Sequence, residues 1–453
     1  MMTVSEYKET VKGKRAAVLG YGVSNRPLVD FLLTLDVRVE VRDKKEPEAE
    51  AMERLAAKGV PIVTGERYLA DLNADLIFRS PGIRPDHPEI KAATDKGAVL
   101  TSEMELFFAL CPATTIAITG SDGKTTTTTL VAKLLEEEGH RVFLGGNIGT
   151  PLLSKVGEMT KDDFAVLELS SFQLFTMRQS PRRAVVTNLS PNHLDWHADM
   201  QEYAVAKENI FRHQAAGDLL VLNRENPHTV EMADKAPGAV RFFSAKRLLA
   251  KGICLQDGVI CLDGEEILKE EDILLPGMHN RENYMAAIAV TEGLVSKESI
   301  YRVASTFTGV EHRLETVRIH KGVRYINSSI DSSPSRTSAA LGCFTDKVIC
   351  ICGGYDKHIP FAPLADALCR HAKAVVLTGA TADAIEKALA ECQSDEKPAI
   401  YRDPDFKSAV LMASSLAHDG DTVILSPACA SFDAFRNFME RGDTFRRIIS
   451  ELE

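Results

Sequence analysis

The chain has 453 residues, and its apolar share of 45% and charged share of 26% are ordinary for a globular protein. Its net charge of −11 argues against a general nucleic-acid binder, and no apolar run approaches the roughly 20 residues of a membrane span. The stretch 1–14 has no apolar signal core, and the nine scattered cysteines show no metal-ligand spacing. We therefore expect a cytoplasmic protein of about three domains, with no membrane span and no nucleic-acid partner.

The first segment, residues 1–110, opens with a strand–helix–strand pattern whose second strand, 37–42, ends at Asp43. This pattern predicts a Rossmann-like domain with its ligand edge at the carboxyl ends of the strands. Asp43 lies about where a ribose-binding acid falls, but Asn25 stands where the dinucleotide fingerprint requires glycine. A tight turn without a ligand is therefore the alternative for Gly20-Tyr21-Gly22.

A later strand of this segment, 75–79, runs into the turn Ser80-Pro81-Gly82-Ile83. The turn exposes backbone N–H groups at the same sheet edge, which makes it a candidate phosphate site. An ordinary Pro-Gly turn is the alternative.

The second segment, residues 111–308, contains Gly120-Ser121-Asp122-Gly123-Lys124-Thr125-Thr126 between an apolar β-branched run and a helical pattern. Backbone N–H groups of such a loop, together with the positive end of the helix dipole, form an anion cradle. Lys124 can reach a β- or γ-phosphate, and the Thr125 hydroxyl can bind Mg²⁺. The strict motif requires glycine at Ile118, so only the shorter form T-G-x-x-G-K-T-T is present, and a polar turn entering a helix is the alternative. The loop predicts a central ATPase-type domain that binds a nucleoside triphosphate.

Three further polar residues of this segment are candidates for the same site. Glu168 ends a buried strand over 164–168, where an acid can hold Mg²⁺ or else cap the next helix. His193 follows the strand 184–188; a lone loop histidine is more often structural, but polar groups converging on one sheet edge favour a ligand. Lys207 lies in a helical run over 200–213 and by itself would be a solvated face residue.

Amide side chains complete the candidates of the second segment. Asn280 and Asn283 are three residues apart near the start of an alanine-rich helix, so they share one face and could frame a base or ribose. Asn147 lies in the flexible turn Gly145-Gly146-Asn147-Ile148-Gly149.

The third segment, residues 309–453, alternates strands and helical runs and is again a doubly wound α/β pattern. Two turns at its strand ends, 353–357 and 426–432, are rich in Gly or Ser. Neither is a phosphate loop, so we expect this segment to contribute groups to the site of the second segment.

Taken in order, these motifs resemble those of the Mur ligases, which build the bacterial cell-wall peptide. The matching motifs are T-G-S-D-G-K-T-T, G-G-N-I-G, L-E-L-S-S-F-Q-L, N-x-S-x-x-H-L-D-x-H, the helical Lys207, G-x-H-N-x-x-N, E-H-R and S-P-A-C-A-S-F-D-x-F-x-x-F-x-x-R-G. Each is weak alone, but the ordered set covers nearly the whole chain. The resemblance implies three domains: a Rossmann-like N-terminal domain, a central phosphate-loop domain and a Rossmann-like, mobile C-terminal domain.

The resemblance also implies a reaction. L-S-S-F-Q-L and S-P-G-I are most similar to the branch of the family that joins D-glutamate to UDP-N-acetylmuramoyl-L-alanine. That branch uses ATP and Mg²⁺ and passes through an acyl phosphate, and we expect the protein to act as a monomer. Relatives that add lysine or diaminopimelate usually carry His in place of Phe172.

Roles follow for the matched positions. The UDP-bearing substrate would contact Val23, Ser24, Asp43, Lys44, Ser80, Pro81, Gly82, Asn147 and Ser170. ATP would contact Gly120, Ser121, Asp122, Gly123, Lys124, Thr125, Thr126, Asn280, Asn283 and Arg313. D-glutamate would contact Lys357, Ser431 and Phe438. The catalytic positions would be Lys124, Glu168, His193 and Lys207. Mg²⁺ would be held by Thr125, Glu168, His193 and Lys207, the last as a carbamate that offers anionic oxygens to a hard cation.

The chain departs from the family pattern in the third segment. Ser328 stands where the family usually has an Asp that contacts ribose, and Ile330 stands where it usually has a Lys. Asp331 is a candidate to take over part of the first role, whereas the second change puts the grip on glutamate in doubt.

The sequence leaves three alternative functions to be considered. One is a related ligase that adds a different amino acid. An NAD-dependent oxidoreductase is opposed by Asn25 and by the lack of a hydride-site constellation. A non-catalytic nucleotide-sensing scaffold would bind ATP without turnover.

Overall fold

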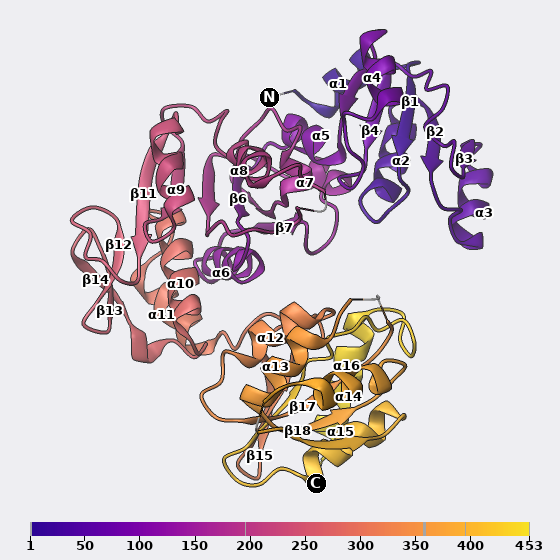
Figure 1. Ribbon diagram of the computed structural model, residues 1–453. Coiled ribbons are helices and arrows are strands. Elements are labelled where there is room, and N and C mark those ends of the chain that lie inside the picture. The colour runs from indigo at the N-terminus through magenta and orange to yellow at the C-terminus, as the bar shows by residue number, and fades with distance from the viewer. Residues whose placement is uncertain (1, 195, 357–358, 395, 453) are drawn as a thin grey trace. The chain divides into compact units, whose positions relative to one another are not determined.

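The computed structural model describes residues 2–194, 196–356, 359–394 and 396–452 (Figure 1). The chain divides into two compact units, one that ends at Thr306 and one that begins at Phe307. The first unit contains two β-sheets and the second contains one.

The first sheet has five parallel strands in the order β3-β2-β1-β4-β5, which is the order of the Rossmann fold. Its strands are β1 (Arg15–Leu19), β2 (Arg38–Asp43), β3 (Ile62–Thr64), β4 (Leu76–Arg79) and β5 (Val99–Thr101). Its helices are α1 (Val4–Val11), α2 (Asn25–Thr34), α3 (Ala49–Ala57), α4 (Pro88–Asp95) and α5 (Glu103–Leu110). Val18 and Leu19 are fully buried, because a parallel sheet is covered on both faces.

The second sheet has nine strands in the order β14-β13-β12-β11-β10-β9-β6-β8-β7. Its strands are β6 (Thr114–Thr119), β7 (Val142–Gly146), β8 (Phe164–Glu168), β9 (Arg183–Val186), β10 (Leu219–Asn223), β11 (Ala239–Ser244), β12 (Ile253–Gln256), β13 (Val259–Leu262) and β14 (Glu265–Lys269). Strands β6 to β11 are parallel, and β12 to β14 form an antiparallel meander at one edge. Because β6 lies between β8 and β9, the loops that follow these three strands open at one edge of the sheet.

The helices of this second sheet include the one that follows the phosphate loop. They are α6 (Lys124–Glu137), α7 (Ser171–Leu174), α8 (Met200–Glu208), α9 (Pro227–Met232), α10 (Met278–Val290) and α11 (Lys297–Thr306), with 3₁₀ helices η1 (Leu153–Glu158), η2 (Ala233–Lys235) and η3 (Glu270–Asp272). Helix α6 packs against α10 and α11, which brings the start of α10 to the phosphate loop.

The sheet of the second unit has the order β15-β16-β20-β17-β18-β19, in which only β15 is antiparallel. Its strands are β15 (Glu315–His320), β16 (Val323–Asn327), β17 (Val348–Cys352), β18 (Ala372–Leu377), β19 (Ala399–Arg402) and β20 (Thr422–Leu425). Its helices are α12 (Pro334–Leu341), α13 (Ala362–His371), α14 (Ala382–Glu391), α15 (Phe406–Ser415) and α16 (Phe438–Ser450).

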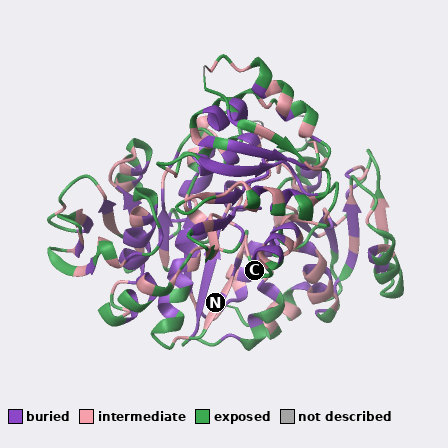
Figure 2. Cartoon of the chain, turned by 90° about the horizontal axis from the view of Figure 1, so that it is seen from below, coloured by how far each residue is buried: buried purple, intermediate pink, exposed green. Residues whose placement is uncertain are grey.

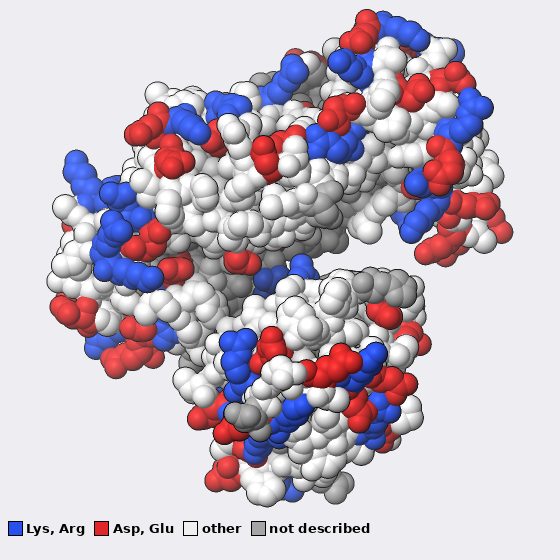
Figure 3. All heavy atoms as spheres, viewed as in Figure 1, with Lys and Arg blue, Asp and Glu red and all other residues white. Residues whose placement is uncertain are grey.

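Hydrophobic packing explains the division into two units. One continuous core runs from Val11 through Leu153 to Met232 and so joins the first two sheets. In the second unit, Cys350 and Ile351 of β17 belong to separate cores, because successive strand residues point to opposite faces. Figure 2 shows many of the strands as buried and many loops as exposed. Figure 3 shows Lys and Arg interspersed with Asp and Glu on the visible face.

The observed elements differ from the sequence expectation in two places. The helical run expected over 200–213 ends at Glu208, and residues 209–213 form turns. The antiparallel meander over 253–269 was not expected, because its short strands carry little alternation. Among the described helices, none is long and apolar enough to cross a membrane.

Candidate active site

The phosphate loop connects β6 to α6 and depends on two glycines. Gly120 and Gly123 have φ angles of 149° and 77°, which other residues rarely adopt. A Cβ on Gly120 would lie 1.8 Å from Thr187 Oγ1, and one on Gly123 would lie 2.5 Å from Asn283 Oδ1. The loop is therefore enclosed by β9 on one side and by α10 on the other.

Neighbouring loops fasten the remaining loop residues. The Asp122 N–H donates to Asn188 Oδ1 at 2.9 Å. Ser121 Oγ donates to the Ser190 carbonyl at 3.0 Å and lies 3.0 Å from Tyr203 Oη. Because the backbone is held this way, Asp122 contributes to the loop mainly through its main chain.

Lys124 lies at the first turn of α6, as the motif predicts. Its Nζ donates to the Gly120 and Ser121 carbonyl oxygens at 3.0 and 2.8 Å, so the side chain curls over the loop. A triphosphate tail in this cradle would meet that ammonium group.

Glu168 brings two other candidate residues together at the end of β8. Its Oε2 accepts the Thr125 hydroxyl at 2.7 Å, and its Oε1 accepts the Asn147 amide at 2.9 Å. The cap of the following helix α7 is Ser170, so the alternative reading of Glu168 as a capping carboxylate is wrong. Acid, hydroxyl and amide thus lie side by side beside the phosphate loop.

Lys207 is buried, with 2% of its surface exposed, which overturns the expectation of a solvated face residue. Its Nζ donates to Thr119 Oγ1 at 3.1 Å and to the Gly120 carbonyl at 2.9 Å, behind the phosphate loop. Burial, and then the neighbouring charge of Lys124, hold the pKa of Lys207 well below its usual value. Tyr203 covers this amine, its ring centroid 4.8 Å away, and lies one helical turn earlier in α8.

His193 lies in the exposed loop after β9, at a positive φ of 56°. Its ring lies 4.8 Å from the Phe172 ring, edge to face, at the start of α7. The loop therefore opens at the same sheet edge as Glu168.

Asn280 and Asn283 lie on one face of α10, as expected. Asn283 Oδ1 accepts the Thr127 hydroxyl of α6 at 3.1 Å, and its amide donates to Asn280 Oδ1 at 3.1 Å. Asn280 in turn donates to the Pro276 carbonyl at 2.7 Å. The pair thus borders the phosphate loop from the α10 side.

In the first sheet, Asp43 braces the turn after β1. Its two oxygens accept the N–H groups of Tyr21 and Lys45 at 2.7 and 2.9 Å. The buried Asn25 amide donates to the Gly20 carbonyl at 2.8 Å, so an internal contact fills the position where a dinucleotide site has glycine. This geometry opposes the oxidoreductase reading.

The other first-sheet candidates line the same edge. A Cβ on Gly20 would lie 2.8 Å from Ser80 Cβ, so the two candidate turns abut. Val23 is 77% exposed beyond β1. Lys44 is a surface residue that pairs with Glu66 at 3.3 Å.

Sequence reasoning missed two arginines at this turn. Arg79 is 1% exposed and donates to the Pro81 and Ile83 carbonyls, both at 3.0 Å, and to the Phe172 carbonyl at 2.8 Å. Arg84 follows the same turn and pairs with Glu202 of α8. Only their position beside Ser80–Ile83 could have signalled them, because their contacts with Phe172 and Glu202 span 93 and 118 residues of sequence.

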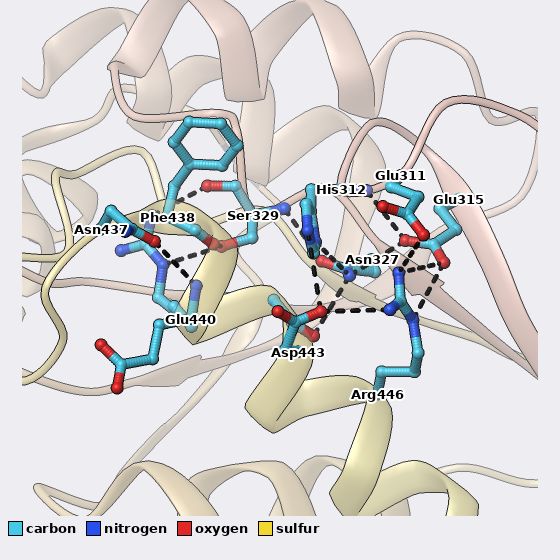
Figure 4. Close-up of polar contacts among 12 residues, drawn as sticks. Glu311, His312, Glu315, Asn327, Ser329, Asn437, Phe438, Glu440, Asp443 and Arg446 are labelled. Atoms are coloured by element: carbon cyan, nitrogen blue, oxygen red, sulfur yellow. Dashed lines mark hydrogen bonds and ion pairs between the residues drawn. The ribbon is translucent and has the colours of Figure 1, made fainter. Parts of the chain in front are cut away.

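In the second unit, Arg313 lies between two residues with positive φ, His312 at 62° and Leu314 at 44°. Glu315 holds this turn: its Oε2 accepts the His312 N–H at 2.8 Å and the Asn327 amide at 3.1 Å (Figure 4). Its Oε1 accepts the Arg446 guanidinium of α16 at 2.8 and 3.2 Å. Glu315 thus links the Arg313 turn to α16, beside a longer pair between Glu311 and Arg446 at 3.6 Å.

The two described glutamate candidates are linked through α16. Ser329 Oγ donates to the Phe438 carbonyl at 2.7 Å (Figure 4). The buried Arg441 donates to the Ala430 carbonyl at 3.1 Å, beside Ser431. Ser431 is 2% exposed. The third candidate, Lys357, lies outside the described residues.

Asp331 is also buried in this unit, and burial raises the pKa of its carboxyl group. It accepts the Ser426 hydroxyl at 2.8 Å. Ser328 Oγ accepts the Leu314 N–H at 3.1 Å. Ser328 thus lies next to the Arg313 turn, and Asp331 lies next to the end of β20.

A phosphate loop beside an acid-ended strand of a parallel sheet defines the phosphate-loop class of nucleotide-binding α/β proteins. Three family models match the chain: "Mur ligase MurD-like, N-terminal domain" over 14–102, "Mur ligase middle domain" over 118–291 and "Mur ligase, glutamate ligase domain" over 312–429. The chain belongs to the Mur ligase family. The expected three-domain α/β fold is thereby confirmed.

Curated relatives are similar over the whole length. The UDP-N-acetylmuramoylalanine–D-glutamate ligases of Acetivibrio thermocellus and Clostridium kluyveri are each 49% identical, with 99% of both chains covered. The ligase of the same name from Clostridium novyi is 48% identical, again over 99% of both chains.

Solved structures share the fold at lower identity. The UDP-N-acetylmuramate-alanine ligase MurC of Thermotoga maritima aligns with a TM-score of 0.60 at 18% identity, covering 97% of this chain and 100% of that one. The pseudomurein peptide ligase type C of Methanothermus fervidus gives 0.56 at 17% identity, with the same coverage.

Proposed function

We propose that this protein is an ATP-dependent ligase that adds D-glutamate to UDP-N-acetylmuramoyl-L-alanine in peptidoglycan precursor synthesis, with release of ADP and phosphate. The observation that carries this proposal is the 49% identity, over 99% of the chain, to ligases named for this reaction. The phosphate loop, with Lys124 curled over it and Glu168 beside it, supplies the ATP site that the reaction needs. The second candidate is a related ligase that adds a different amino acid.

We assign the three tasks to three domains. Residues 1–110 bind the UDP-bearing substrate, 111–308 bind ATP and 309–453 bind the incoming amino acid. The protein works as a monomer in the cytoplasm, where its nucleotide substrates are made.

The chemistry follows from the poor reactivity of a carboxylate, whose leaving group would be oxide. Transfer of the γ-phosphoryl group to the substrate carboxylate makes an acyl phosphate with a good leaving group. Lys124 and the N–H groups of the loop offset charge on the moving phosphoryl group. The amine of D-glutamate then attacks the acyl carbon, a tetrahedral intermediate forms and phosphate leaves. Exclusion of water by the third domain protects the acyl phosphate from hydrolysis.

The donor set beside the phosphate loop suits Mg²⁺. Glu168 is 2% exposed, and its carboxylate already contacts the Thr125 hydroxyl, so two oxygen donors lie together. Thr125, Glu168 and His193 would hold the ion, and Lys207 would join them as a carbamate. When bound, Mg²⁺ supplies charge neutralisation for the phosphates.

Lys207 fits this role only after modification, because an ammonium group has no lone pair for a cation. Carbamylation joins the neutral amine to carbon dioxide and releases one proton. Burial lowers the pKa of Lys207 and so favours the neutral amine.

The substrates are assigned to the remaining candidates. Val23, Ser24, Asp43, Lys44, Ser80, Pro81, Gly82, Asn147 and Ser170 hold the UDP-bearing substrate. Arg313 reaches the phosphates, and Lys357, Ser431 and Phe438 hold D-glutamate. Asp331 takes over part of the ribose contact that Ser328 cannot make.

His193 acts as a metal or substrate ligand in this account, not as a general base. This role is supported if His193→Ala weakens binding of the metal or substrate and leaves the pH profile of activity unchanged. A lost basic limb with metal binding retained contradicts it.

An amino-acid panel tests the function. Purified protein is mixed with ATP, Mg²⁺ and UDP-N-acetylmuramoyl-L-alanine, and phosphate release is measured with each amino acid in turn. Release with D-glutamate alone supports the proposal, and release with another amino acid instead supports the related ligase. ATP binding without substrate-dependent release would mean a nucleotide-sensing scaffold.

A further inference from the structure

Arg84 connects the Ser80–Ile83 turn of the first domain to helix α8 of the central domain. Its guanidinium makes a two-pronged pair with Glu202, at 3.1 Å from Nη1 and 2.9 Å from Nη2. Asp86 accepts a second pair of hydrogen bonds from the same group, at 2.9 and 2.8 Å. Planar two-pronged pairs fix orientation as well as distance. Lys207 lies on the same helix as Glu202, five residues farther along.

Trp196 is held between the same two elements. Its indole N–H donates to the Gly82 carbonyl of the turn at 3.0 Å, and its own carbonyl accepts Arg84 Nη1 at 2.7 Å. The Arg84 guanidinium also lies over the indole ring, 4.9 Å from its centroid. The first domain therefore contacts both the ring and the main chain of Trp196.

Trp196 belongs to the loop that carries His193. The N–H groups of Trp196 and His197 donate to the His193 carbonyl at 3.1 and 2.9 Å. The His197 ring is buried and lies 2.9 Å from Ser171 Oγ, next to Ser170, the N-cap of α7. Two residues proposed at the ATP and metal site, His193 and Lys207, are thus connected to the first-domain turn through Arg84.

We propose that Arg84 is a positioning residue that couples occupancy of the UDP-substrate site to the His193 loop and helix α8 of the ATP site. A ligand on the Ser80–Ile83 turn fixes Gly82 and Arg84, and these in turn fix Trp196 and Glu202. Substrate on the turn thereby favours the arrangement of the ATP site that binds nucleotide. Linkage requires the reverse effect as well, so bound nucleotide strengthens binding of the UDP substrate by the same factor. This inference rests on the proposed function, because it takes both ligands from it.

A binding cycle measures the coupling directly. The affinity for a non-hydrolysable ATP analogue with Mg²⁺ is measured by calorimetry, with and without saturating UDP-N-acetylmuramoyl-L-alanine. We expect the UDP substrate to tighten analogue binding by at least about fivefold in the parent protein. The factor falls toward one in Arg84→Ala, and in Arg84→Lys, because lysine cannot form the two-pronged pair.

Arg241 provides a matched control in the same unit. It forms a two-pronged pair with Glu292, at 3.1 and 2.8 Å, and is exposed to a similar degree as Arg84, 24% against 30%. Arg241→Ala should lose a comparable pair yet keep the full coupling factor and the basal activity. Loss of coupling in both variants would make the effect one of general stability and would overturn the proposal.

The sequence also supplies a local reporter, because Trp196 is its only tryptophan. UDP-N-acetylmuramoyl-L-alanine should shift the intrinsic fluorescence of the parent protein and of Arg241→Ala, and should shift that of Arg84→Ala much less. A parent protein without any coupling factor contradicts the proposal. So does Arg84→Ala if it weakens UDP-substrate binding equally with and without nucleotide, since Arg84 would then only hold the substrate.

Different results would overturn the Arg84 coupling and the proposed ligase activity. If D-glutamate-dependent phosphate release is found but the coupling factor survives in Arg84→Ala, only the coupling is wrong. If the parent protein releases no phosphate with any amino acid, the proposed function itself is wrong.

Discussion

The phosphate loop of the first unit and the Arg313 turn of the second unit both contain positive φ angles and carry a cation, but they are held in different ways. Around the loop, Gly120 and Gly123 supply the positive φ angles, and several main-chain contacts share the task of holding it. Around Arg313, non-glycine residues adopt positive φ, and Glu315 makes the main side-chain contacts. Loss of one side chain beside the phosphate loop leaves its main-chain contacts in place, whereas loss of the Glu315 carboxylate removes several contacts of the Arg313 turn at once.

The largest effect is expected for Lys124→Ala. The variant leaves the loop main chain in place but removes the ammonium group, so kcat should fall by about 10²–10³-fold. Steady-state phosphate release gives kcat, and calorimetry should show unchanged binding of the UDP substrate. Lys133→Ala is the control, because Lys133 lies on the same helix and pairs with Glu136 at the surface. If kcat of Lys124→Ala falls less than about fivefold, the Lys124 ammonium group does not stabilise the transferred phosphoryl group.

The next largest effect is expected for Lys207→Ala, which should lose roughly a hundredfold of activity. A short carboxylic acid such as acetate can enter the space left by the side chain and should restore part of the rate. Lys207→Met is the matched control, because it removes the amine but fills the space, and acetate should not help it. Full activity of Lys207→Ala without bicarbonate or added acid is incompatible with a carbamate.

Glu315→Gln tests the side-chain-held turn. The change removes the charge that holds Arg446 and leaves the turn free to shift Arg313, so kcat should fall by roughly tenfold or more. Binding of the UDP substrate should not change. Asp421→Asn is the control: Asp421 also accepts a main-chain N–H and a cation in this unit, at 2.7 and 2.6 Å, away from Arg313. Equal losses of activity in the two variants would mean that Glu315 acts only on stability.

The smallest effects are expected for two glycine variants, Gly139→Ala and Gly123→Ala. Their comparison separates the cost of a positive φ angle from the cost of a steric clash at the phosphate loop. Gly139→Ala, at a φ of 96° with no atom near the added Cβ, should lose only about 1–2 kcal/mol of stability. Gly123→Ala adds a clash with Asn283 to the same strain, so it should be less stable than Gly139→Ala and should bind ATP more weakly. Thermal unfolding and calorimetry measure the two quantities. Equal stability and unchanged ATP affinity would show that the loop can move aside.

Sequence patterns predicted the parts of the molecule that depend on local chemistry. The phosphate loop and strands such as β8 and β17 were readable, because glycine geometry and buried apolar runs are local signals. The burial of Lys207 was not readable, since nothing in its own helix shows that the phosphate loop covers it. The partners of Arg84 and Glu315 were missed for the same reason, because each pairs with residues more than a hundred positions away.

One isotope measurement tests the central claim that the substrate carboxylate is phosphorylated before the amine attacks. UDP-N-acetylmuramoyl-L-alanine labelled with ¹⁸O in its terminal carboxylate is converted with ATP and D-glutamate, and the released phosphate is examined by mass spectrometry. The account predicts one ¹⁸O atom in each released phosphate, because the acyl oxygen leaves with it. Released phosphate without the label would contradict the account.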